Sequence, residues 1–163
     1  MADREPGDVA TDGRDETAAQ RADRNWTEIL QEFRVTQTGT QVLAGFLLTV
    51  AFQSGFSRLH PYQQVVYLVL VILAAATTTV GLVTVSLHRR MFRRRHKPEL
   101  VRAADIHLKL MLTLLSILTA GVVFFLFDVV TSLAIAVVAG VLVALGMLGG
   151  MLLYPLLVVR GPR

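Results

Sequence analysis

Cysteine is absent from the 163 residues of this chain, and charged residues are absent from long parts of it. Without cysteine, disulfide bonds, thiolate catalysis and thiolate-bound metal sites are excluded. Asp, Glu, Lys and Arg are missing from four stretches, at residues 35–57, 59–88, 110–127 and 129–159. A helix needs ~20 mostly apolar residues to cross bilayer hydrocarbon, where a charged side chain is costly. The pattern therefore predicts an integral membrane protein with four transmembrane helices.

The predicted fold class is all-α: a four-helix transmembrane bundle with an N-terminal amphipathic interfacial helix and a disordered N-terminal tail. Residues 39–160 form the predicted transmembrane domain, with spans at about 39–57, 62–87, 106–127 and 133–155. Residues 129–132 leave room only for a tight turn, so the third and fourth spans should form an antiparallel hairpin. No basic region precedes the first apolar run, so we expect no cleaved signal peptide.

The N-terminal part is polar. Residues 1–24 hold seven acids and four arginines with little apolar surface, a composition typical of a disordered tail. Residues 25–38 should form the amphipathic helix, since Asn25 and Glu28 resemble a capping box. Its apolar side chains recur at helical spacing, as Trp26, Ile29, Leu30 and Phe33. This helix is expected at the membrane surface or against a basic protein surface.

The distribution of basic residues predicts the orientation of the bundle. With four spans, both termini lie on the same side of the membrane, and that side holds nearly all of the bases that follow the tail. Eight of the sixteen Lys and Arg residues lie between Arg89 and Lys109, whereas the opposite side holds only Arg58. The positive-inside rule then places both termini in the cytoplasm and the protein in the plasma (inner) membrane.

Two segments carry a resemblance to a known family. Residues 25–39 read NWTEILQEFRVTQTG, and residues 88–94, closing the second span, read HRRMFRR. Together they resemble an actinobacterial family of small four-span integral membrane proteins that is catalogued as a domain of unknown function. The similarity covers about residues 25–158, which leaves the acidic tail outside. The resemblance implies a four-span fold and no mechanism, although some relatives are labelled sodium/proton antiporters.

Ion exchange needs a titratable group inside the membrane, and small four-span multidrug exporters use a glutamate in the first span for this purpose. Here the first span offers only Gln41 and Gln53 as long polar side chains, and neither titrates. Asp128 is the one carboxylate that borders a span core. Its alternatives are helix capping or turn formation on one side and a proton or cation site on the other. The candidate ion site is therefore Asp128, Gln41 and Gln53.

Two further groups of residues have predicted structural roles. The first is a salt-bridge latch between the amphipathic helix and the basic loop expected at residues 88–105, with an ordinary solvated face as the alternative. Its members are Glu28, Glu32, Arg34, Arg89, Arg90 and Arg93. The second comprises two rows of small residues in the fourth span, each with members four positions apart, which suits close helix packing within the chain or between copies. The rows are Ala136, Gly140 and Ala144, and Gly146 and Gly150.

The sequence favours neither catalysis nor cofactor binding. The four histidines lack the spacing of a metal site, and no phosphate loop or nucleophile elbow is present, so we expect no enzyme, metal or cofactor. The basic loop has one aromatic residue, Phe92, and is expected to contact the anionic lipid headgroups of the bilayer and not nucleic acid. The leading functional hypothesis is a structural or accessory membrane protein, as a homo-oligomer or within a larger complex. The alternative is a small transporter or channel subunit.

Overall fold

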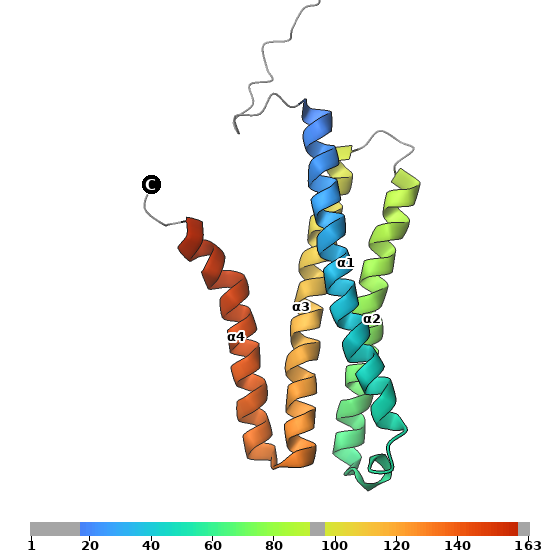
Figure 1. The fold of residues 1–163 in the computed structure, drawn as a ribbon, viewed down its shortest axis with the longest axis vertical. Helices are drawn as coiled ribbons and strands as arrows, with labels where there is room; N and C mark the ends of the chain where they lie inside the picture. Colours follow the sequence, from blue (N-terminus) through green and yellow to red (C-terminus); the bar gives the residue numbers. More distant parts are fainter. Residues whose placement is uncertain (1–16, 92–96, 160–163) are drawn as a thin grey trace, which may run out of the picture.

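The structure, a computed structural model, describes the backbone of residues 17–91 and 97–159. Within these ranges the chain is all-α, with four long helices and one short 3-10 turn (Figure 1). These elements are α1 (Ala18–Ala51), η1 (Phe56–Arg58), α2 (Pro61–Met91), α3 (Lys97–Val130) and α4 (Leu133–Val159). The predicted all-α, four-helix class is confirmed.

The helices run alternately up and down. In Figure 1, α1, α2 and α3 lie alongside one another, while α4 lies beside α3 at its start and diverges from it towards its end. The connections at residues 52–60 and 131–132 lie at the same end of the bundle, which we call the connector end. The start of α1 and the end of α4 lie at the opposite end (Figure 1). The short turn between α3 and α4 confirms the predicted antiparallel hairpin.

Helix α1 differs from the prediction at its beginning. It begins at Ala18, after a capping box in which the Thr17 side chain accepts from the Gln20 backbone and the Gln20 side chain accepts from the Thr17 backbone. The cap predicted at Asn25 is therefore wrong, and residues 18–24 are helical; the rest of the predicted disordered tail, residues 1–16, lies outside the described residues. No proline occurs between Ala18 and Ala51, so nothing in the chain separates the predicted surface helix from the first span.

The apolar stripe of the predicted surface helix faces the bundle. Phe33 is 5% exposed and packs in a buried cluster with Leu108 and Met111 of α3, with Ile29 against the same cluster. The prediction of a separate interfacial helix is replaced by a continuous α1, because burial against α3 removes these side chains from solvent. At ~1.5 Å per residue, the 34 residues of α1 extend for about 50 Å.

The basic loop predicted at residues 88–105 is shorter than expected. Helix α2 continues to Met91 and α3 already begins at Lys97, so only residues 92–96 separate the two helices, and these lie outside the described residues. Pro98 does not interrupt the helix, because it lies in the first turn of α3, where a helix does not require the missing backbone N–H. In the same way, α4 passes the predicted exit at residues 154–155 and ends at Val159.

The main core lies between α1, α2 and α3. Its buried members are apolar: Leu47, Tyr67, Leu70, Ala74, Leu118, Val122 and Phe125. The buried threonines near this core bond within their own helices, as Thr40 does to the Thr36 carbonyl at 3.0 Å and Thr77 to the Leu73 carbonyl at 2.7 Å. The hydroxyl groups are thereby satisfied without polar links between helices.

Three of the helices are long and apolar enough to cross a membrane. The qualifying segments are Pro61–Ser86, Ala103–Val130 and Leu133–Leu153. Helix α1 is not among them, because its middle carries Thr36, Gln37, Thr38, Thr40 and Gln41 ahead of its apolar last turns. Three of the four predicted spans therefore have the required length and composition.

Candidate functional site around Asp128

Asp128 lies in the last turn of α3 at the connector end, and only 8% of it is exposed. The Tyr62 hydroxyl group donates to its carboxylate, with Oη at 2.8 Å from Oδ2 and 3.0 Å from Oδ1. The Gln63 amide nitrogen donates to Oδ2 at 2.9 Å. The carboxylate is therefore held by side chains of the first turn of α2, on the other hairpin of the bundle.

Gln63 joins this interaction to the start of α2. Its side-chain oxygen accepts from the backbone N–H of His60 at 3.0 Å, while its nitrogen reaches Asp128. The oxygen thus satisfies a backbone donor just ahead of a helix that begins with proline. A carboxylate is also favoured near a helix N-terminus, where the backbone dipoles leave partial positive charge. Asp128 therefore links α3 to α2, in place of the local cap or turn that was one of its predicted roles.

A cavity of about 410 Å³ opens beside this carboxylate. Its walls come from the connection before α2, the first turn of α2, the end of α3, the turn and the start of α4. The lining residues are Gly55, Arg58, Leu59, His60, Tyr62, Gln63, Asp128, Val129, Thr131, Ser132 and Leu133. Both an acid and a base contribute to the wall of this cavity, which makes it the most polar of the described cavities.

The connection that carries Arg58 and His60 is anchored to the core. The Phe56 ring packs edge-on against Tyr67, with ring centroids 5.0 Å apart, and Leu59 packs against the same core cluster. The Tyr67 hydroxyl group in turn donates to the Leu47 carbonyl at 3.0 Å. The His60 ring lies nearly parallel to that of Tyr62, at 12° and 6.0 Å between centroids. These contacts fix the position of the connection on the cavity wall.

The other predicted members of the ion site are not gathered here. Gln41 is exposed and lines a separate groove between α1 and α2, with Arg34 and Gln37. Gln53 is exposed on the connection and is not part of the cavity wall. The partners of Asp128 are Tyr62 and Gln63, which sequence reasoning missed. The available signal was the polar pair Gln63 and Gln64 at the start of an otherwise apolar run.

The predicted latch stays a prediction. Glu28, Glu32 and Arg34 are exposed on α1, and within the described residues no ion pair joins these carboxylates to Arg34. The side chains of Arg89 and Arg90, and the whole of Arg93, lie outside the described part of the chain. The ion pair described on α3 is a local one, between Lys109 and Asp105 at 2.7 Å, with the lysine side chain 73% and the aspartate side chain 46% exposed.

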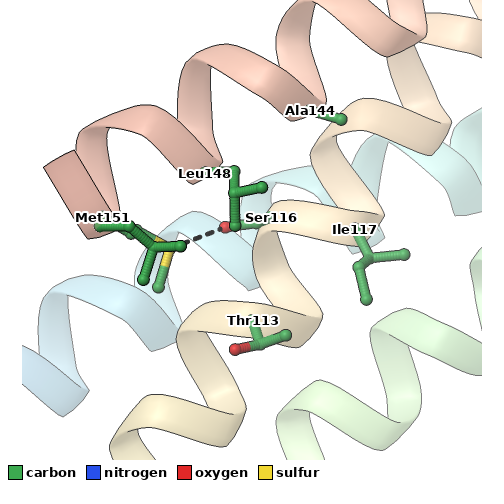
Figure 2. Close-up of a pocket in the computed structure, with 7 residues that line it drawn as sticks. Thr113, Ser116, Ile117, Ala144, Leu148 and Met151 are labelled. Atoms are coloured by element: carbon green, nitrogen blue, oxygen red, sulfur yellow. Dashed lines mark hydrogen bonds between the residues drawn. The ribbon is translucent and has the colours of Figure 1, made fainter.

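The small residues of α4 divide into two groups. Ala136 is fully buried against the bundle, and a Cβ at Gly140 would lie 3.0 Å from the Phe124 Cβ of α3. Ala144 is exposed and lines a groove of about 300 Å³ between α3 and α4, where Ser116 contacts the Met151 sulfur at 3.5 Å (Figure 2). Gly146 and Gly150 have no atom within 4 Å of an added Cβ. Ala136 and Gly140 therefore pack on α3, whereas Gly146 and Gly150 face away from the described bundle.

The helical bundle with its long apolar helices defines the class to which this chain belongs: an all-α protein with the features of an integral membrane protein. The particular family follows from comparison with known proteins. Residues 15–155 match the profile of the "Family of unknown function (DUF6328)", so the chain belongs to that family. The match confirms the expected membership of a family of unknown function and begins before Asn25. Searches of curated proteins and of solved structures find no match.

Proposed function

We propose that this protein is a four-span membrane protein of the plasma (inner) membrane with both termini in the cytoplasm. The contacts of α1 support the first span, because its second half packs along α2 and α3 and contributes Leu47 to the main core. A helix packed in this way crosses the membrane together with α2 and α3, even though its own composition is more polar than theirs. Arg34 and Lys109 precede the charge-free parts of α1 and α3 that lead to the connector end, whereas Arg58 lies on the connection at residues 52–60; this distribution favours cytoplasmic termini.

The role that fits this arrangement best is structural or accessory, through helix–helix contacts with other membrane proteins or with further copies of this chain. The single observation that carries the proposal is the isolation of α4. It packs against α3, and only 11% of its candidate span is buried. Its free side presents Gly146 and Gly150 with open space around them, and small residues allow the close backbone approach on which membrane helix association depends.

A small transporter or channel subunit is the second candidate, and the Asp128 cavity is the observation in its favour. The residues next to it weigh against transport by a single copy. From Asp128 towards the middle of α3, the residues facing the core are Phe125, Val122 and Leu118, all apolar and buried. An ion leaving the cavity would have to cross this core without polar ligands, at a high desolvation cost.

The remaining proposals concern chemistry and partners. We propose no enzymatic activity, because Asp128 is engaged by Tyr62 and Gln63 and the site shows no activated nucleophile. The basic segment at residues 88–105 is proposed to contact anionic lipid headgroups, each base near the surface contributing ~1 kcal/mol. Nucleic acid is not a proposed partner.

Crosslinking in native membranes tests the accessory role. A photoreactive residue at Leu145 of α4, which is 59% exposed, is compared with one at Ile72 of α2, which is 69% exposed. We expect a discrete protein adduct from Leu145 and only lipid adducts from Ile72. Lipid adducts alone from both positions would contradict the proposal. Reporter fusions at His60 and Arg95 test the topology separately, and they should report opposite sides of the membrane.

A further inference from the structure

The cavity at the connector end holds two opposite charges that do not pair with each other. Arg58 and Asp128 both line it, yet within the described residues no salt bridge joins them. Asp128 is more than nine-tenths buried, and a buried carboxylate is costly unless it is both hydrogen-bonded and paired with positive charge. Tyr62 and Gln63 supply the hydrogen bonds, but neither supplies positive charge.

The carboxylate also retains capacity to accept a further hydrogen bond. The Tyr62 hydroxyl group has a single hydrogen, and it lies within hydrogen-bond distance of both carboxylate oxygens. The Gln63 amide donates to Oδ2 alone. An ionised carboxylate offers about four acceptor sites, so Oδ1 can accept from another donor. A positively charged N–H donor would both donate a hydrogen bond to this oxygen and supply the missing positive charge.

Arg58 adds the complementary half of a binding site. A guanidinium group presents a planar set of donors that matches the oxygens of a phosphate. The connection that carries Arg58 is held on the core by Phe56 and Leu59, so the base is attached to a fixed part of the cavity wall. The cavity thus presents an acceptor for a cation and a donor for an anion within about 410 Å³, a volume in the range of ligand sites.

The location of the cavity indicates which kind of molecule meets it. The wall is built where α2 and α4 begin and α3 ends, which is the depth of lipid headgroups if these helices span the bilayer. Exposed apolar side chains contribute to its wall, with Val129 45% and Leu133 54% exposed. A polar hollow with an apolar border at this depth suits a headgroup whose acyl chains remain in the surrounding lipid.

We propose that this cavity binds the zwitterionic headgroup of phosphatidylethanolamine in the outer leaflet, with its ammonium group on Asp128 and its phosphate on Arg58. The proposal rests on the membrane arrangement proposed above. A simple cation is disfavoured because Arg58 repels it, and a simple anion is disfavoured because Asp128 repels it. A choline headgroup carries both charges but has no N–H to donate to the carboxylate, so ethanolamine is preferred.

Lipid binding to the purified full-length chain in detergent tests the proposal by native mass spectrometry. Phosphatidylethanolamine, phosphatidylcholine and phosphatidylglycerol with identical acyl chains are compared. We expect phosphatidylethanolamine to bind about tenfold more tightly than phosphatidylcholine, as the loss of one charged hydrogen bond implies. Equal affinity for these two lipids would overturn the proposal. Because this measurement uses no membrane, its outcome does not depend on the topology or partner experiments.

Two variants separate the two halves of the site. Asp128→Asn should lower the affinity for phosphatidylethanolamine to that for phosphatidylcholine, because it removes only the contact that distinguishes them. Arg58→Gln should weaken the binding of both lipids by a similar factor; the Arg58 side chain is exposed, and the described hydrogen bond of this residue, to the Gly55 carbonyl, is made by its backbone and is kept in the variant. Arg34→Gln, at an exposed base of α1 that does not line this cavity, is the matched control and should change neither affinity. Wild-type binding by Arg58→Gln would overturn the proposal even if Asp128→Asn failed to fold.

A last comparison identifies the source of the headgroup. Free phosphoethanolamine carries the same two charges without acyl chains, and it is added as a competitor at increasing concentration. If phosphoethanolamine binds much more weakly than phosphatidylethanolamine, the ligand is a membrane lipid, because the acyl chains then add affinity through the apolar part of the cavity wall. Binding as tight as that of phosphatidylethanolamine would overturn the lipid assignment in favour of a soluble zwitterion.

Discussion

The hydroxyl oxygen of Tyr62 lies 2.8 Å from Oδ2 of Asp128, although the two residues are 66 positions apart in the chain. Tyr62 lies in the first turn of α2, in the first hairpin, and Asp128 lies in the last turn of α3, in the second hairpin. With the Gln63 amide 2.9 Å from the same oxygen, the pair forms a polar link between the two halves of the bundle. A hydrogen bond to a charged acceptor is stronger than one between neutral groups.

Tyr62→Phe should therefore destabilise the bundle. It removes one hydrogen bond to a buried carboxylate, for which a loss of about 1–3 kcal/mol is typical. Tyr67→Phe is the matched control, since it removes a hydrogen bond of 3.0 Å to the neutral Leu47 carbonyl, with an expected loss of about 0.5–1.5 kcal/mol. Thermal unfolding in detergent measures both. A larger loss for Tyr67→Phe than for Tyr62→Phe would contradict the importance assigned to Asp128.

Gly140→Leu should disrupt the packing of α4 on α3. A Cβ at this position would lie 3.0 Å from the Phe124 Cβ and 3.7 Å from the Phe124 Cα, so the larger leucine side chain cannot be placed without moving a helix. Overpacking of this kind costs about 1–3 kcal/mol or more. Gly146→Leu is the control on the same helix, because nothing lies within 4 Å of its Cβ position.

The measurements for this pair are the melting temperature and the oligomeric state in detergent. Gly140→Leu should lower the melting temperature, and Gly146→Leu should leave it unchanged. If the free side of α4 contacts a second copy, Gly146→Leu should instead change the oligomeric state. An unchanged state and melting temperature for Gly140→Leu would remove the packing role of this row.

Gly121→Ala should be costly although it adds only one methyl group. The new Cβ would lie 2.5 Å from the Leu70 Cδ2, and Leu70 is 4% exposed within the main core, so its side chain has little room to move. We expect a loss of about 1–3 kcal/mol from overpacking. Gly45→Ala, with nothing within 4 Å, should be neutral or gain up to about 1 kcal/mol from helix propensity. Denaturation in mixed micelles compares the two, and equal stabilities would contradict the close approach of α2 and α3.

The apolar helices could be predicted because the signal for them is local. Each charge-free stretch indicates a buried or lipid-facing helix without reference to any other part of the chain, and α2, α3 and α4 follow from this alone. The early start of α1 was also present in the sequence. Thr17 and Gln20 have the spacing of a capping box, but the surrounding acidic composition favoured a disordered reading.

The candidate site could be predicted only in part. Asp128 stands out in the sequence because it is the single acid between two apolar runs. Its partners follow from the tertiary arrangement, since the register of α2 against α3 decides which polar side chain meets it. Gln41 and Gln53 were equally polar candidates, and helix packing placed them elsewhere. The same limit applies to Phe33, whose burial against Met111 depends on the approach of α3.

The last prediction is that a single copy of this chain does not perform proton-coupled antiport. Exchange requires one site that binds a proton and a cation in turn and that both sides of the membrane reach alternately. Asp128 is the one acid at the edge of the span cores, and it is fixed at the connector end by Tyr62 and Gln63. The buried core residues Phe125 and Leu118 separate it from the other end of the bundle. Purified protein in liposomes with an internal pH dye should therefore show no sodium-driven pH change, and the Asp128→Asn variant should likewise show none. A sodium-driven pH change in the wild type that Asp128→Asn abolishes would instead make this carboxylate a transport site.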